Sequence, residues 1–187
     1  ADATNVLAAA QDGAVGGFTD INTVADATTS VLNAYGLASD QAKKLVDGFI
    51  QTQNDGKITV GQYAGEIGRI APVAKSAGVG IDELNAAISA ATAQGVPVGS
   101  TFAGLRQAIS SILDPSEKAR AYAKRLGLDF SAAALQAKGF GGFMAEVAAK
   151  TGGSAEAIIK LTGSVEAQAA IQPLVNDQLK KYNQFLD

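Results

Sequence analysis

Residues 102–117 read FAGLRQAISSILDPSE, and this stretch decides the fold class. Its large apolar side chains recur at the three- and four-residue spacing of one face of an α-helix: Phe102, Leu105, Ile109, Ile112 and Leu113. The segment that follows offers Asp114 as an N-cap, Pro115 at the first helical position and Glu117 at the third, so a new helix is predicted to begin there. The stretch therefore predicts a helix, a tight turn and a second helix.

The same alternation of helix and turn extends along the chain in both directions. An apolar stripe at helical spacing runs from Val24 to Tyr35, where Gly36 interrupts it. Thr59 and Gln62 form a capping-box pattern that opens another helix, which Pro72 is predicted to kink or end. Further helices are predicted after Ser39, after Gly80, from Pro115 to Gly127, and at residues 132–138, 140–150, 155–161 and 165–170.

The composition also favours an all-α fold. Ala, the residue with the lowest cost in a helix, dominates the 47% hydrophobic content, whereas aromatic residues make up 6% and Trp is absent. We expect a multi-helix assembly of short amphipathic helices joined by Gly/Pro turns, with a thin and closely packed core. Phe140, Phe143 and Met144, at helical spacing, are expected to belong to this core.

The C-terminal residues predict one longer helix. From about Gln172 to the last residue the large apolar side chains share one face, and no cap, Gly or Pro closes the stripe. We therefore divide the chain into a helical core domain, residues 1–170, and the truncated start of an extended helix, residues 171–187. The missing initiator Met leads us to expect that the start is also cut from a longer chain. A solitary helix would expose its apolar face to water, so we predict five candidate residues for self-association: Val175, Leu179, Tyr182, Phe185 and Leu186.

Most residue types that build chemical sites are missing. Without His or Cys the chain has no common nucleophile–base triad, zinc site or disulfide. The adjacent Asp82 and Glu83 are explained as first-turn acids of a helix. The turn at residues 54–56 resembles the middle of a calcium-binding loop, but it would offer one carboxylate where Ca²⁺ needs several. We predict no catalytic, metal-binding or cofactor-binding residue and no enzymatic activity.

The charges do not indicate a nucleic-acid or membrane partner. The net charge is −3, and the densest basic segment, Lys118 to Arg125, has the acidic neighbours Asp114 and Glu117. This segment is expected to be a solvated face, with a DNA-contacting module as an alternative hypothesis. The longest uncharged stretch, Leu84 to Leu105, contains polar residues and a Gly-Pro loop, so it predicts helix, loop and helix rather than a membrane span.

Several segments, taken in order, resemble the core domain of phage tail tape measure proteins. The densest match is GLDFSAAALQAKGF at residues 127–140, continuing to Gly142 and Phe143. The resemblance extends nearly from end to end, and the order and spacing of the segments make it specific. The other matching segments are NAYGL (33–37), RIAPVA (69–74) with Gly78 and Val79, TAQGV (92–96), GLR (104–106), PS (115–116) and GSVEA (163–167).

The resemblance implies a part in a very long, mostly helical chain that lines the tail tube during assembly, sets tail length, and leaves at infection to help the genome cross the envelope. It implies a virion protein of the tail interior, made in the host cytoplasm. The implied partners are further copies of itself, as a trimer or hexamer, and tube, hub and baseplate proteins. No specific nucleic acid is implied, and membrane contact is implied only for other parts of the parent chain.

The length of the chain limits this role. As one continuous helix, 187 residues would reach only about 280 Å, at about 1.5 Å per residue. We therefore expect a compact domain attached to the ruler rather than the ruler itself. The alternative is a cell-wall-degrading or host-entry enzyme domain of a phage tail protein.

Overall fold

The computed structural model describes residues 2–177 and 179–186, and it is all-α, as predicted. Within these residues there are eleven α-helices, a 3₁₀ turn at Ser39–Gln41 and no strand. The helices are α1 (Asp2–Gly16), α2 (Ile21–Tyr35), α3 (Ala42–Asp55), α4 (Val60–Ser76), α5 (Ile81–Ala93), α6 (Val98–Leu113), α7 (Glu117–Leu126), α8 (Ala132–Thr151), α9 (Ala155–Thr162), α10 (Val165–Asn176) and α11 (Lys180–Leu186).

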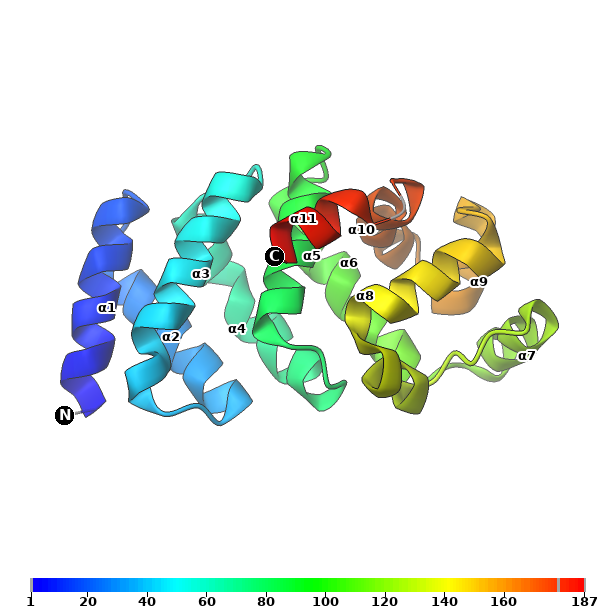
Figure 1. Ribbon diagram of the computed structural model, residues 1–187, viewed down its shortest axis with the longest axis horizontal. Helices are drawn as coiled ribbons and strands as arrows, with labels where there is room; N and C mark the ends of the chain where they lie inside the picture. Colours follow the sequence, from blue (N-terminus) through cyan, green and yellow to red (C-terminus); the bar gives the residue numbers. More distant parts are fainter. Residues whose placement is uncertain (1, 178, 187) are drawn as a thin grey trace.

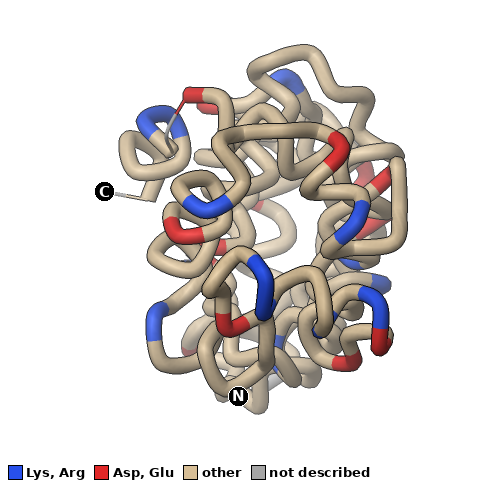
Figure 2. The backbone as a smooth tube through the Cα atoms, turned by 90° about the vertical axis from the view of Figure 1, so that its right-hand side faces the viewer, with Lys and Arg blue, Asp and Glu red and all other residues tan. Residues whose placement is uncertain are grey.

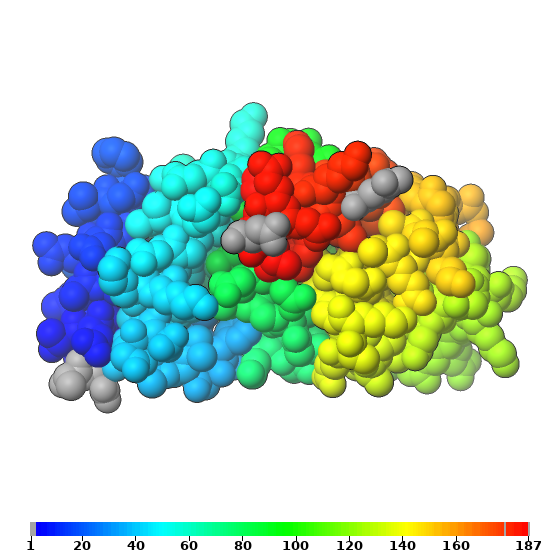
Figure 3. All heavy atoms as spheres, viewed as in Figure 1, coloured from blue at the N-terminus to red at the C-terminus, as the bar shows by residue number. Residues whose placement is uncertain are grey.

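The helices follow one another along a long axis (Figure 1). Helix α1 lies at one end, α5 and α6 lie near the middle, and α7 and α9 lie at the other end. Packing between helices that are distant in sequence joins these parts: α2 packs on α4, α4 on α6, and α6 on α10. The last helix, α11, returns to the middle and packs on α5, so the C-terminal segment lies between α3 and α8 on the surface that Figure 3 shows.

Side-chain caps fix many of the helix starts. Thr59 and Gln62 form the predicted capping box, with hydrogen bonds of 3.2 and 3.0 Å. Four Ser side chains each accept a hydrogen bond from the backbone N–H three residues later, and caps of this kind contribute about 1 kcal/mol each. These residues are Ser116, Ser131, Ser154 and Ser164.

The start of α7 differs from the prediction. The N-cap is Ser116, not Asp114, and Glu117 is the first helical residue rather than the third. Asp114 instead ends α6, because its N–H donates to the Ser110 carbonyl at 3.0 Å. Gly127 ends α7 in the left-handed conformation, with φ 64°, at the position where the sequence predicts the helix to stop.

Two further differences come from packing that the sequence pattern does not reveal. Pro72 does not end α4, which continues to Ser76 with Ala71 and Ala74 buried on either side of the proline, whereas a kink at Pro72 stays a prediction. Helix α1 is absent from the sequence prediction, since it has few large apolar residues. It packs closely on its neighbours, and a Cβ atom at Gly13 would lie 2.6 Å from a methyl group of Val46.

The core is continuous from Ala9 to Tyr182 and contains many alanines. The predicted core residues Phe140, Phe143 and Met144 are all buried. Helices α6 and α10 approach each other closely at Gly104 of α6, where a Cβ atom would lie 2.3 Å from the Glu166 carbonyl oxygen of α10. Small residues therefore bring these helix backbones into direct contact.

Candidate functional site

The C-terminal segment, predicted as one extended helix from Gln172, forms two helices. Helix α10 ends at Asn176 and α11 begins at Lys180, and Leu179 between them has a left-handed backbone with φ 62°. The Leu179 N–H donates to the Leu174 carbonyl at 2.9 Å, which closes the end of α10. Only 2% of Leu179 is exposed, so burial of its side chain compensates for the unfavourable backbone. The prediction of a single helix is therefore wrong, and the predicted boundary at residue 170 falls inside α10.

Tyr182 belongs to the core of its own chain. Its ring centroid lies 5.9 Å from that of Phe140, and a Cβ atom at Gly141 would lie 2.7 Å from the Tyr182 ring. Burial raises the pKa of Tyr182 above its ordinary value, and the negative charge of Glu83 raises it further. The Tyr182 side chain is therefore enclosed by α8 and is not available to a second copy.

Phe185 and Leu186 lie where α11 meets α3 and α5. They line a small groove of ≈ 190 Å³ together with Thr52 of α3 and Ser89 of α5. Phe185 is half-buried, whereas 38% of Leu186 is exposed. Of the five predicted residues, these two have the most surface left for contact with another molecule.

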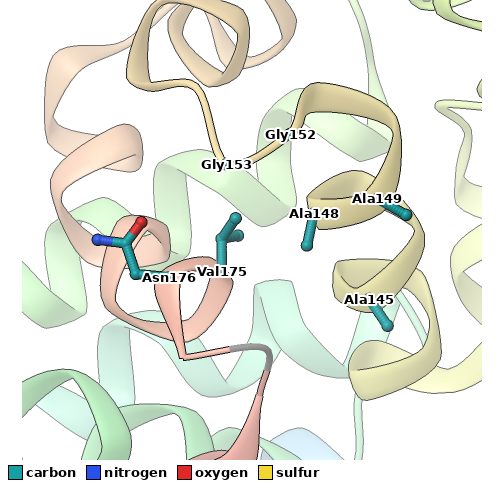
Figure 4. Close-up of a pocket in the computed structure, with 7 residues that line it drawn as sticks. All are labelled: Ala145, Ala148, Ala149, Gly152, Gly153, Val175 and Asn176. Atoms are coloured by element: carbon teal, nitrogen blue, oxygen red, sulfur yellow. The ribbon is translucent and has the colours of Figure 1, made fainter.

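Val175 lies at the bottom of a separate groove, between the end of α8 and the end of α10. Figure 4 shows Ala145 and Ala148 of α8 opposite Val175, with Gly152 and Gly153 in the segment that leaves α8. The groove has a volume of ≈ 530 Å³, and none of the described side chains that line it is charged. Apart from Asn176 its described lining is apolar, and these residues offer no group for chemistry.

The five predicted residues therefore lie in three places rather than on one exposed stripe. Leu179 and Tyr182 lie in the core, Val175 lies in the groove beside α8, and Phe185 and Leu186 lie beside α3. Self-association through this segment stays a prediction.

Glu83 has a structural role that the sequence predicts only in part. Its Oε2 accepts a hydrogen bond from the Gly80 N–H at 3.0 Å, as expected for an acid in the first turn of α5. Its Oε1 accepts a second bond, from the Phe140 N–H at 2.8 Å, directly after a break in α8 at Gly139. Both oxygens are therefore occupied by backbone donors. The sequence predicts the break at Gly139. It does not predict that the Phe140 N–H after the break bonds to Glu83, 57 residues away.

The basic segment lies on α7, at the end of the molecule that faces the viewer in Figure 2. The side chains of Arg125 and Lys160 lie over the Tyr122 ring, 5.8 and 5.4 Å from its centroid. Arg120 forms an exposed ion pair of 3.4 Å with Asp114. The face is exposed, as predicted, and Lys118 makes no ion pair within the part of the chain that the structure describes.

Neither a metal cluster nor a membrane span is found among the described residues. At no place in residues 2–177 and 179–186 do three or more His, Cys, Asp or Glu side chains gather so that they could hold a metal ion. None of the helices described combines the length and the apolar character needed to cross a membrane.

Comparison with known proteins identifies the family. The family model of the phage-related minor tail proteins matches residues 1–168. The chain belongs to this family. Minor tail proteins are components of the virion, which agrees with the resemblance found in the sequence.

Two relatives of this chain carry the name tape measure protein, one of them as a probable one. The chain is 34% identical over 70 residues to a probable tape measure protein of Clostridium phage phiCD119, which covers 37% of this chain and 7% of the relative. It is 29% identical over 111 residues to the tape measure protein of Pneumococcus phage Dp-1, which covers 59% of this chain and 10% of that relative. The matches thus span a small part of both relatives. No solved structure matches the chain.

Proposed function

We propose that this chain is a non-catalytic domain of a tape measure protein, which takes part in setting tail length during assembly. The observation that carries the proposal is the family match over residues 1–168, together with two relatives that are named as tape measure proteins and are many times longer than the matched segment. The domain lies in the interior of the tail tube or baseplate, beside tube, hub and baseplate proteins. It leaves the tail at infection and assists DNA ejection.

The fold supports a structural role. Successive helices are short, and even the longest, α8 with 20 residues, would span only about 30 Å if it were straight. The two adjacent acids of α5 have structural partners: Glu83 accepts two backbone hydrogen bonds, and Asp82 pairs with Lys44 at 3.5 Å on the surface. Together with the absence of His and Cys from the sequence, this use of the acids supports a domain without catalytic activity.

The location is tested by quantifying peptides of this chain in purified virions of the phage that encodes it. We expect the peptides in intact virions and a marked loss from tails that have ejected their DNA. Equal amounts before and after ejection would contradict release, and absence from virions would contradict the whole proposal.

The role in assembly is tested by deleting the codons of these residues in frame. We expect missing tails or tails of irregular length in electron micrographs. Infectious particles with tails of normal length would show that the domain is not needed.

A peptidoglycan-release assay on the purified chain tests the enzymatic alternative, and clear release would overturn the non-catalytic assignment.

We also propose that the domain self-associates in the tail, as a trimer or hexamer. The C-terminal candidates that retain exposed surface support this proposal, since Leu186 leaves an apolar side chain in water. The variant Phe185→Ser/Leu186→Ser is expected to sediment at a lower mass than the wild type. An unchanged mass would contradict self-association through the C-terminal residues.

A further inference from the structure

The two ends of the long axis carry charges of opposite sign. Residues 2–41, which include α1, α2 and the 3₁₀ turn at one end, contain Asp as their only charged residue type, and the two lysines that follow, Lys43 and Lys44, are paired with Asp47 and Asp82. Helix α7, at the opposite end, contains Lys118, Arg120, Lys124 and Arg125 against the single acid Glu117. The ends are therefore electrostatically complementary to each other.

The acidic end also has an apolar groove, which we call the end groove. It lies between α1, α2 and the residues after α2, has a volume of ≈ 670 Å³, and includes Val6, Leu7, Leu32 and Leu37 in its lining. Leu7 is 57% exposed and Leu37 is 37% exposed. Large apolar side chains left in water at a groove are typical of a contact surface.

Unpaired acids flank the end groove. Asp26 and Asp40 each follow a lining residue directly in the sequence, Ala25 and Ser39. Both Asp side chains are exposed, and neither makes an ion pair within the described chain. A partner that fits this surface should have a narrow apolar centre and cations on both sides.

The exposed face of α7 has this arrangement. At 100° per residue, Ala121 lies at its centre, with Lys118 and Arg125 on one side and Arg120, Lys124 and the acid Glu117 on the other. Long Lys and Arg side chains can cover apolar surface with their aliphatic stems while their charged groups reach an acid at the rim. Lys118 and Lys124 have no ion-pair partner among the residues that the structure describes.

We propose that α7 of one copy lies in the end groove of a second copy, with Lys118 and Lys124 facing Asp26 and Asp40. This contact names a surface for the self-association proposed above, and it uses residues other than Phe185 and Leu186. Because the two faces are different, the contact is heterologous and builds either a closed ring or a filament. A closed ring of three or six copies meets the proposed oligomeric state.

The test reverses the charge at one end at a time and measures mass by sedimentation velocity. Wild type is expected to form oligomers whose mass falls as salt rises from about 0.1 M to about 1 M, since the screening length shortens from about 10 Å to about 3 Å. The variants Asp26→Lys/Asp40→Lys and Lys118→Glu/Lys124→Glu are each expected to associate about tenfold more weakly or worse, approaching the 18.9 kDa monomer. Mixing the two variants is expected to restore association, because each groove then meets an α7 of opposite charge; a closed ring of alternating variants then needs an even number of copies.

A matched control changes two exposed cations elsewhere. The variant Lys57→Glu/Arg106→Glu alters the net charge as much as the α7 variant does, and it should associate like the wild type. Single-end reversals that leave the mass unchanged would overturn the proposed contact. If Phe185→Ser/Leu186→Ser still lowers the mass in that case, self-association stands and only this surface is wrong. A wild type that is monomeric at all concentrations would overturn both self-association and the proposed α7 contact. The proposed location in the virion would still stand, because it is measured independently.

Discussion

At the scale of single residues, close packing of the helices depends on glycines, which have no side chain. Gly104, Gly13 and Gly141 each occupy a point where a neighbouring helix leaves no space for a Cβ atom. Such positions cannot be recognised in a chain with 21 glycines, because many of the others end helices or face solvent. Replacing a glycine by Ala should therefore destabilise the protein at a closely packed position and stabilise it at an open position within a helix.

Gly104→Ala is expected to destabilise the protein by about 1–3 kcal/mol. The new methyl group would lie 2.3 Å from the Glu166 carbonyl and 2.6 Å from the Ala170 Cβ, so α6 and α10 must move apart. Gly65→Ala is the matched control, at an exposed position in the middle of α4. An added Cβ atom there would have no neighbour within 4 Å outside its own helix backbone, so the change should stabilise the protein by about 0.5–1 kcal/mol. Urea unfolding measures both, and equal effects of the two changes would contradict the close approach.

Buried tyrosines should make the fold sensitive to alkali. Burial raises the pKa of Tyr35, Tyr63 and Tyr182 above the ordinary value of 10.0. The folded state thus holds these protons more tightly than the unfolded chain. Their contribution to stability is complete below pH 10.0 and is lost as the pH rises towards the folded-state pKa.

Tyr182→Phe tests this dependence, because it keeps the ring that packs on Phe140 and removes the ionisable group. Comparing urea unfolding at pH about 8 and about 11, we expect the variant to lose less free energy of unfolding than the wild type does. A loss as large as that of the wild type would show that Tyr182 does not contribute.

At the scale of helices, α11 joins the core instead of extending from it. Ending the chain after Asn176 removes Leu179 and Tyr182 from the core, and we expect the free energy of unfolding to fall by at least about 3 kcal/mol. The control Phe185→Ser/Leu186→Ser changes only the more exposed end of α11 and should cost about 1 kcal/mol or less. Full stability after truncation would support the predicted appended helix instead.

Local signals explain which helices the sequence predicts. The capping box at Thr59 and the glycine at Gly127 act within one helical turn, so the sequence predicts both. The turn at Leu179 depends on burial of its side chain in the core, and no Gly or Pro marks it. The second hydrogen bond of Glu83 and the packing of α1 likewise need distant partners. The burial of Leu179 and Tyr182 could not be predicted for the same reason, since a stripe on an isolated helix resembles a surface even where the fold buries it.

At the scale of the whole molecule, the fold predicts how much length the domain adds to the tail. Inserting a second copy of these residues in frame into the parent chain should lengthen tails by far less than the about 280 Å of a continuous helix, because successive helices pack side by side. Tail lengths are measured in electron micrographs. The control insertion is an uninterrupted helical repeat of equal length, which should add about 280 Å. An increase of that size from this domain would mean that it is extended in the tail.

The position of α11 has a mechanical consequence. Helix α1 lies at one end of the long axis and α11 lies on the surface near the middle, so tension applied at these two helices would peel each from its neighbours. The chain contains no Cys, so no disulfide would interrupt this peeling. Helices that detach one after another resist force less than helices that must all separate together. Under tension, we expect a domain built in this way to unfold in steps that begin at α1 and α11.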